Sequence, residues 1–177
     1  MKIRTKFTKL KGHKMKKLLV FVLALAGLFS ACNDGGANAQ NTKHIELYQS
    51  PACGCCGKWV EYMQAKGYTV SVHKDDAYYD YKGERFGIKD IYESCHTGLA
   101  GGYALEGHLP EDAVAWLLAA KPKGVIGIAV PGMPMGSPGM ELGGEDEQYP
   151  VVIMLKDGGY KIYGTYKGHQ LIKKGEF

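Results

Sequence analysis

The stretch that decides the fold is Ser50-Pro51-Ala52-Cys53-Gly54-Cys55-Cys56-Gly57-Lys58-Trp59. Before it, His44 to Tyr48 alternates apolar and polar residues and predicts a strand. After its first cysteines, apolar residues at three- and four-residue spacing predict a helix from Cys56 to Lys66. Tyr68 to His73 alternates again and predicts a second strand. A thiol at the start of such a helix faces the positive end of the helix dipole and free backbone N–H groups, which favour the thiolate.

Three cysteines within four residues support two kinds of chemistry. Cys53 and Cys56 have the C-x-x-C spacing of a dithiol oxidoreductase. Cys55 adds a thiol that a redox pair does not need, and thiolates select soft metal ions such as Cu(I). The vicinal Cys55 and Cys56 side chains must diverge, which disfavours tetrahedral closure around one ion and favours thiolates that bridge several Cu(I) ions. We expect a metal site and keep the redox pair as the alternative.

Further candidate ligands lie outside this stretch. Cys95 and His96 are in a segment predicted to be irregular, from where they can approach the cluster and complete it. His108 comes just before a predicted helix and is interpreted as a helix-entry residue. His44, His73 and His169 stand isolated in the sequence, and the pattern assigns them no role.

Methionines are concentrated in one predicted loop. Met133, Met135 and Met140 lie in a Gly- and Pro-rich stretch without periodicity. Thioethers bind Cu(I) and are poor zinc ligands, so Met133 and Met135 favour copper as the metal. An equal alternative is that the loop is a hydrophobic lid over the cysteines.

The rest of the chain predicts an α/β fold. Pro110 to Ala120 is an amphipathic helix, and two strand-like segments near the C-terminus flank a Lys-Asp-Gly-Gly turn. This order of elements resembles the thioredoxin fold: a strand, a cysteine motif, a helix, a second strand and, late in the chain, a hairpin that begins with a proline. The resemblance implies a thioredoxin-like sheet with flanking helices, a cis Pro150 packed near Cys53, and residues 75–145 as an elaborated insertion between the two halves.

The N-terminus predicts export. Residues 1–17 carry eight Lys or Arg and no acid, and the apolar run Leu18 to Phe29 is shorter than the roughly 20 residues of a spanning helix. Ser30-Ala31-Cys32 then resembles a lipoprotein processing site, with Cys32 acylated. The alternative is an ordinary signal peptide cut near Ala39. The expected parts are a signal peptide (1–31), a flexible tether (32–43) and one metal-binding domain (44–177).

Charge excludes one class of partner. Removing the basic signal peptide changes the formal charge from +4 for the whole chain to −4. The remainder has no basic patch interleaved with aromatic residues, so nucleic acid is not an expected partner.

With these residues in view, the chain resembles the CopG-like family of periplasmic copper-resistance proteins over about Ile45 to Leu155. The marks are SPACGCCGKW, Cys95-His96-Thr97, GYALEGHLP and AVPGMPMGSPGME. The resemblance implies a thioredoxin-like fold whose cysteines bind a polynuclear copper-thiolate cluster, with Cys95 as the fourth thiolate beside Cys53, Cys55 and Cys56. It also implies a role in interconverting copper oxidation states during detoxification.

The expected protein is therefore a Cu(I)-binding lipoprotein of the cell envelope that faces the periplasm. Its expected partners are copper ions, the membrane through the lipid anchor, and copper-efflux components. Whether it turns over as a copper oxidoreductase is left open by the sequence. The alternative function is a membrane-tethered thiol-disulfide oxidoreductase that uses Cys53 and Cys56.

Overall fold

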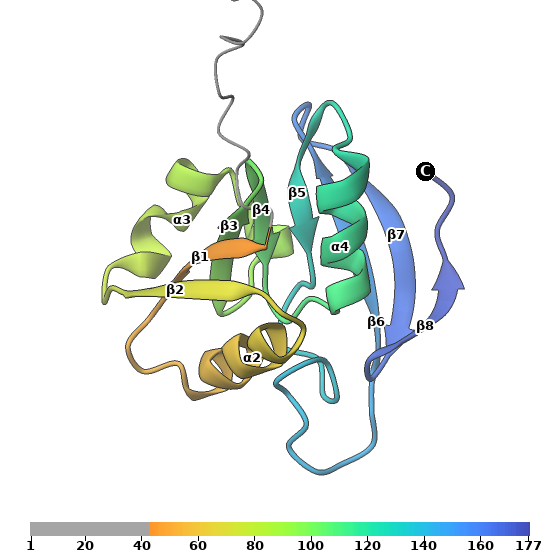
Figure 1. Ribbon diagram of the computed structural model, residues 1–177. Coiled ribbons are helices and arrows are strands. Elements are labelled where there is room, and N and C mark those ends of the chain that lie inside the picture. The colour runs from red at the N-terminus through yellow and green to blue at the C-terminus, as the bar shows by residue number, and fades with distance from the viewer. Residues whose placement is uncertain (1–42) are drawn as a thin grey trace, which may run out of the picture. The chain divides into compact units, whose positions relative to one another are not determined.

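A computed structural model describes residues 43–177, which form one mixed sheet with helices on both faces (Figure 1). The expected signal peptide, Cys32 and nearly all of the tether lie outside the described residues. The elements are, in chain order, β1 (His44–Gln49), α2 (Gly54–Ala65), β2 (Thr69–Lys74), α3 (Tyr78–Phe86), the 3-10 helix η1 (Asp90–Tyr92), β3 (His96–Ala100), β4 (Tyr103–Glu106), α4 (Glu111–Ala120), β5 (Val125–Ala129), β6 (Gln148–Leu155), β7 (Tyr160–Lys167) and β8 (Gln170–Lys174).

The eight strands lie in the order β2-β1-β3-β4-β5-β6-β7-β8. β1 and β2 are parallel and are joined by α2, as a crossover helix requires. β3 returns antiparallel to β1, and β4 is antiparallel to β3. This half of the sheet, with its helices, confirms the predicted α/β class and thioredoxin-like sheet. β5 runs parallel to β4, and the antiparallel strands β6, β7 and β8 extend the sheet.

The predicted place of Pro150 is wrong. The described residues contain no cis peptide bond, and Pro150 is exposed within β6, opposite Thr165. The strand that returns beside β1 is β3, and the residue before it is Cys95. Residues 75–145, predicted as an insertion, accordingly contain β3, β4 and α4. The strands that extend the sheet, β5 to β8, follow α4 in the chain. The pattern missed β3 because four of its five residues are buried, which removes the alternation expected of a half-exposed strand.

The core has two layers, one on each face of the sheet. Ile45 and Leu47 of β1 pack with Trp59 and Met63 of α2 and with the buried face of α4. On the other face, Tyr78 and Phe86 of α3 pack with residues of the central strands. The alternation of β1 thus sends successive side chains to opposite layers. Within residues 43–177, none of the helices combines the length and the apolar character that crossing a bilayer demands.

Candidate metal centre

The start of α2 presents three cysteines to one place. Cys53 N–H donates to Ser50 O (3.1 Å), which closes the turn after β1. Cys53 is then the N-cap residue with an extended backbone, and no side chain caps the helix. The N–H groups of the first turn of α2 therefore keep their positive potential for anionic sulfur, as helix N-termini do for other anions.

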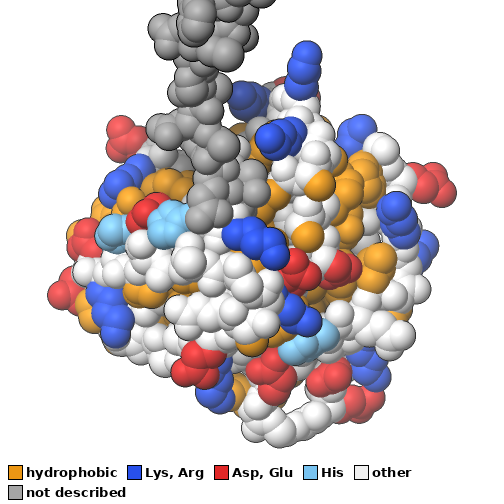
Figure 2. Space-filling model, viewed as in Figure 1, with side chains coloured by type: hydrophobic (Ala, Val, Ile, Leu, Met, Phe, Trp, Pro, Cys, Tyr) orange, Lys and Arg blue, Asp and Glu red, His pale blue; other side chains and the backbone are white. Residues whose placement is uncertain are grey.

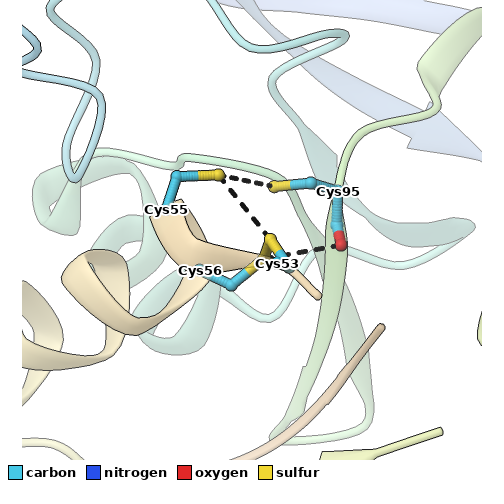
Figure 3. A group of neighbouring side chains, drawn as sticks. All are labelled: Cys53, Cys55, Cys56 and Cys95. Atoms are coloured by element: carbon cyan, nitrogen blue, oxygen red, sulfur yellow. Dashed lines mark hydrogen bonds between the residues drawn. A yellow bond between two sulfur atoms is a disulfide. The ribbon is translucent and has the colours of Figure 1, made fainter. Parts of the chain in front are cut away.

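β3 brings the fourth cysteine to the same place. Gln49, the last residue of β1, is opposite His96 in the antiparallel pair, so Cys95 lies beside the turn that leads into α2. Cys55 Sγ is 3.9 Å from Cys95 Sγ and 3.6 Å from Cys53 Sγ (Figure 3). One ligand atom from each of the four cysteines lies within 4.8 Å of the others. Segments 40 residues apart thus form a single cluster of sulfur atoms.

The cluster is in a partly oxidised state. Cys53 and Cys56 form a disulfide, while Cys55 and Cys95 are free thiols (Figure 3). A disulfide sulfur carries no negative charge and is a poor ligand compared with a thiolate. Reduction of this bond is therefore needed before all four cysteines can bind one group of soft metal ions.

Two histidines contact Cys95 from the buried side. His108 Nε2 lies 3.0 Å from Cys95 Sγ, and His96 Nδ1 lies 3.2 Å from it. His108 Nδ1 is 2.8 Å from Pro138 O, a carbonyl that can only accept, so Nδ1 carries the proton and the Nε2 lone pair faces the sulfur. A histidine that ligates a metal is usually oriented by such a contact through its other nitrogen. His96 Nε2 is buried without a hydrogen-bond partner.

Burial sets the protonation of these groups. It lowers the pKa of His96 well below its usual range, with smaller contributions from His108 and Lys82, and it lowers the pKa of His108. Both rings are therefore neutral near pH 7, the form that binds metal. Burial, followed by the nearby Cys55, raises the pKa of Cys95 to about 12. Cys95 thus keeps its proton until a cation replaces it.

The methionine loop (residues 132–144) packs beside the centre, against α2 and His108. Its residues 136–140 are buried, and Met140 is 6% exposed. Gly139 lies against the first turns of α2, where a Cβ would come within 2.7 Å of Trp59 N. Met133 is 52% exposed and Met135 is partly buried. The buried end of the loop therefore packs against α2 and His108, whereas the Met133 side chain is about half exposed.

Most of the predicted centre is brought together. Cys53, Cys55, Cys56 and Cys95 meet, and His96 contacts Cys95. His108 was interpreted as a helix-entry residue, yet it also contacts Cys95. The signal that could have revealed it is its position just after β4, two residues beyond Glu106, because β4 pairs with β3 and its end therefore lies near Cys95.

Comparisons with known proteins agree with this geometry. Residues 92–140, which include Cys95, both contacting histidines and the methionine loop, match the family model described as "Protein of unknown function, DUF411". No curated protein matches the sequence.

Two solved structures of a copper resistance protein copG, Form 1 and Form 2, are similar to this chain. Each is 35% identical to it and superposes with a TM-score of 0.65. The match to Form 1 covers 71% of this chain and 98% of that one, and the match to Form 2 covers 70% and 97%. Identity at this level over nearly the whole of those chains shows common family membership, and the chain therefore belongs to the CopG-like copper-resistance family.

Proposed function

We propose that this protein binds Cu(I) outside the cytoplasm through Cys53, Cys55, Cys56 and Cys95, and so contributes to copper detoxification. The observation that carries the proposal is the meeting of these four sulfur ligands within 4.8 Å. Thiolates favour Cu(I) over hard ions. The similarity to copper resistance proteins supports copper as the metal.

Several Cu(I) ions fit this donor set better than one. Cys55 and Cys56 are neighbours in the first turn of α2, and Cys95 faces them from β3. Sulfur can bridge two copper ions, and His108 offers a neutral nitrogen whose lone pair faces Cys95. We propose a polynuclear copper-thiolate cluster in which Cys95 is the central bridging ligand, because it is the cysteine shared by both groups of candidate ligands.

The disulfide adds a redox step to this proposal. Oxidation of the Cys53 and Cys56 thiols to the disulfide releases two electrons and two protons, which balances the reduction of two Cu(II) ions to Cu(I). The same two cysteines cannot be thiolate ligands while they are bonded to each other. Binding of copper by all four cysteines and formation of the disulfide are therefore mutually exclusive, and the proposed protein exchanges electrons with copper as well as holding it.

A second candidate function is thiol-disulfide exchange without copper. The disulfide at the start of α2 favours it, and so does a hollow of about 550 Å³ beside Cys53, lined by α2 and by Val72 and Lys74 of β2. A partner thiol could reach the bond from this hollow. The surplus thiols Cys55 and Cys95 have no part in such a reaction.

Cys55→Ser separates the two functions. If the protein is a copper protein, the variant should lose at least one bound Cu(I) per chain in an anaerobic titration. If it is a thiol-disulfide oxidoreductase, the variant should keep its insulin-reduction rate because Cys53 and Cys56 remain. Lys58→Ala, an exposed change on the same helix, is the control. Normal Cu(I) binding by Cys55→Ser would contradict the copper proposal.

The proposed location is the cell envelope, with the domain facing the periplasm and Cys32 carrying the lipid. The basic and apolar N-terminal segments and Ser30-Ala31-Cys32 support it. Replacing Cys32 by Ser should release the protein from the membrane fraction and abolish incorporation of labelled palmitate. Unchanged labelling would contradict the anchor, and efflux components at the membrane are then no longer favoured as partners.

A further inference from the structure

Two histidines that stand far apart in the sequence meet at one glutamate. His44 and Glu46 are two residues apart on β1, and His73 is on the parallel neighbour β2. His44 Nε2 lies 2.6 Å from Glu46 Oε1, and His73 Nε2 lies 2.6 Å from Glu46 Oε2. We propose that His44, Glu46 and His73 form a second metal site, which binds a divalent ion of the Cu(II) and Zn(II) class.

The site is separate from the cysteines. His44 and Glu46 alternate along β1 with Ile45 and Leu47, which are buried beneath α2, so they face the opposite side of the sheet. All three side chains of the site are between about a third and a half exposed. Figure 2 shows histidine and acidic side chains gathered at the surface in the region of β1 and β2. A hydrated ion can reach them directly.

The ligand atoms are those that borderline divalent ions prefer. Two imidazole nitrogens and a carboxylate oxygen suit Cu(II) and Zn(II), whereas Cu(I) prefers sulfur. Hydrogen bonds from His73 and then His44 lower the pKa of Glu46, which keeps it anionic. His44 and His73 contact different oxygens of Glu46, and the three ligand atoms do not all lie within 4.8 Å of one another. Bonds of about 2.0–2.2 Å to one ion therefore require the two partly exposed rings to turn toward a shared point.

Neighbouring side chains contact both rings. His44 Nδ1 lies 2.8 Å from Thr69 Oγ1, and His44 Nε2 donates to Glu46, so the ion must displace the Nε2 proton before this nitrogen can bind it. The His73 ring stacks on Tyr48, with ring centroids 4.6 Å apart and planes 18° apart. Such contacts orient metal-binding histidines and reduce the entropy lost on binding. An ordinary surface ion pair needs only one histidine, whereas here two histidines contact the two oxygens of the same carboxylate.

The chain offers a matched control. His169 Nε2 contacts Glu141 Oε1 at 2.5 Å, and the two side chains are 44% and 49% exposed, much like His73 and Glu46. This pair has one imidazole instead of two. If a lone histidine-carboxylate pair were sufficient for binding, both places would bind the ion equally.

The test is Cu(II) binding to the full untagged chain with Cys32, Cys55 and Cys95 replaced by Ser, which keeps the Cys53–Cys56 disulfide and leaves no free thiol. Competition with glycine gives the dissociation constant, and electron paramagnetic resonance counts the nitrogen ligands. We expect His44→Ala, His73→Ala and Glu46→Gln each to weaken binding at least about tenfold, which a lost ligand worth about 1.4 kcal/mol gives. Each histidine variant should also lose one coordinating nitrogen, and His169→Ala should change the constant less than twofold.

Equal binding by all four variants would overturn the proposal, as would loss of binding only in His169→Ala. A second measurement does not depend on the serine background. In the unsubstituted, oxidised chain, substoichiometric Cu(II) should broaden the amide resonances of residues 44–46 and 71–73 before those around Cys95. Broadening at the cysteines alone would contradict the site while leaving the proposed copper function intact.

Discussion

Lys82 and Glu106 form an ion pair inside the molecule. Lys82 Nζ lies 2.6 Å from Glu106 Oε1, and the two side chains are 4% and 0% exposed. Lys82 also donates to Ser94 O (2.8 Å), while Ser94 N–H donates to Glu106 (2.7 Å). Burial raises the pKa of Glu106, and the Lys82 ammonium opposes that rise. The pair thus holds Ser94, the residue that immediately precedes Cys95.

Lys82→Met removes the ammonium and keeps most of the apolar stem. Glu106 is then buried without its counter-charge, and Ser94 O loses a donor. Removing one member of a buried pair costs about 3–5 kcal/mol, and near-complete burial places this variant in that range. Glu106→Gln should also destabilise the protein, because Lys82 then keeps only Glu93, whose Oε1 lies 3.5 Å away and whose side chain is 43% exposed. The double variant buries no net charge, so its loss should be smaller than the sum of the single losses by about 2 kcal/mol.

Urea unfolding of the oxidised protein, followed by tryptophan fluorescence and circular dichroism, measures these losses at an unchanged m value. Lys89→Met is the control, because Lys89 is exposed and donates to Gly158 O at 2.7 Å. Its loss should stay within about 0.5 kcal/mol. A loss below about 1 kcal/mol for Lys82→Met, or simple additivity in the double variant, would refute the reasoning.

Three further predictions concern the centre itself. Gly139→Ala should lower the free energy of unfolding by about 1–3 kcal/mol in urea, because Gly139 has a φ of +86° and lies against Trp59; Gly57→Ala, which has open space, should not. Iodoacetamide at pH 8 should modify Cys55 well before Cys95 in the reduced apoprotein. The reason is that a pKa of about 12 leaves roughly one Cys95 in 10,000 as the reactive thiolate. Equal modification rates of the two cysteines, measured by mass spectrometry, would contradict this. The free energy of unfolding of the apoprotein should fall as the pH drops below about 6.5. The cause is that His96 binds a proton in the unfolded state but, with its lowered pKa, stays neutral in the folded state. Urea titrations at pH 7 and pH 5 measure the fall, and His96→Phe should make it smaller.

The first strand, the cysteine helix and the second strand could be read from the sequence because their periodicities are local. β1 alternates buried and partly buried residues, and α2 buries Cys56, Trp59 and Met63 at helical spacing. The cysteine cluster was predicted for a similar reason, since three of its members lie within four residues. Predicting that these three cysteines lie close together therefore requires no knowledge of which strands pair.

The remaining parts of the centre depend on strand pairing, which one sequence does not reveal. Cys95 reaches Cys55 because β3 pairs antiparallel with β1, and β3 itself is too buried to alternate. The late proline-led hairpin resembled the missing half of the sheet but forms an extension, in which Pro150 is exposed. His44 and His73 looked isolated because only the parallel pairing of β1 with β2 brings them together.

The measurement that tests the central claim most directly is an anaerobic Cu(I) titration of the reduced chain with Cys32 replaced by Ser, so that the four cysteines of the centre are its only thiols. Bound copper and free thiols are counted on the same sample. The account predicts more than one Cu(I) per chain, with Cys53, Cys55, Cys56 and Cys95 all protected from alkylation. One ion or none, together with rapid return of the Cys53–Cys56 disulfide on exposure to air, would contradict it.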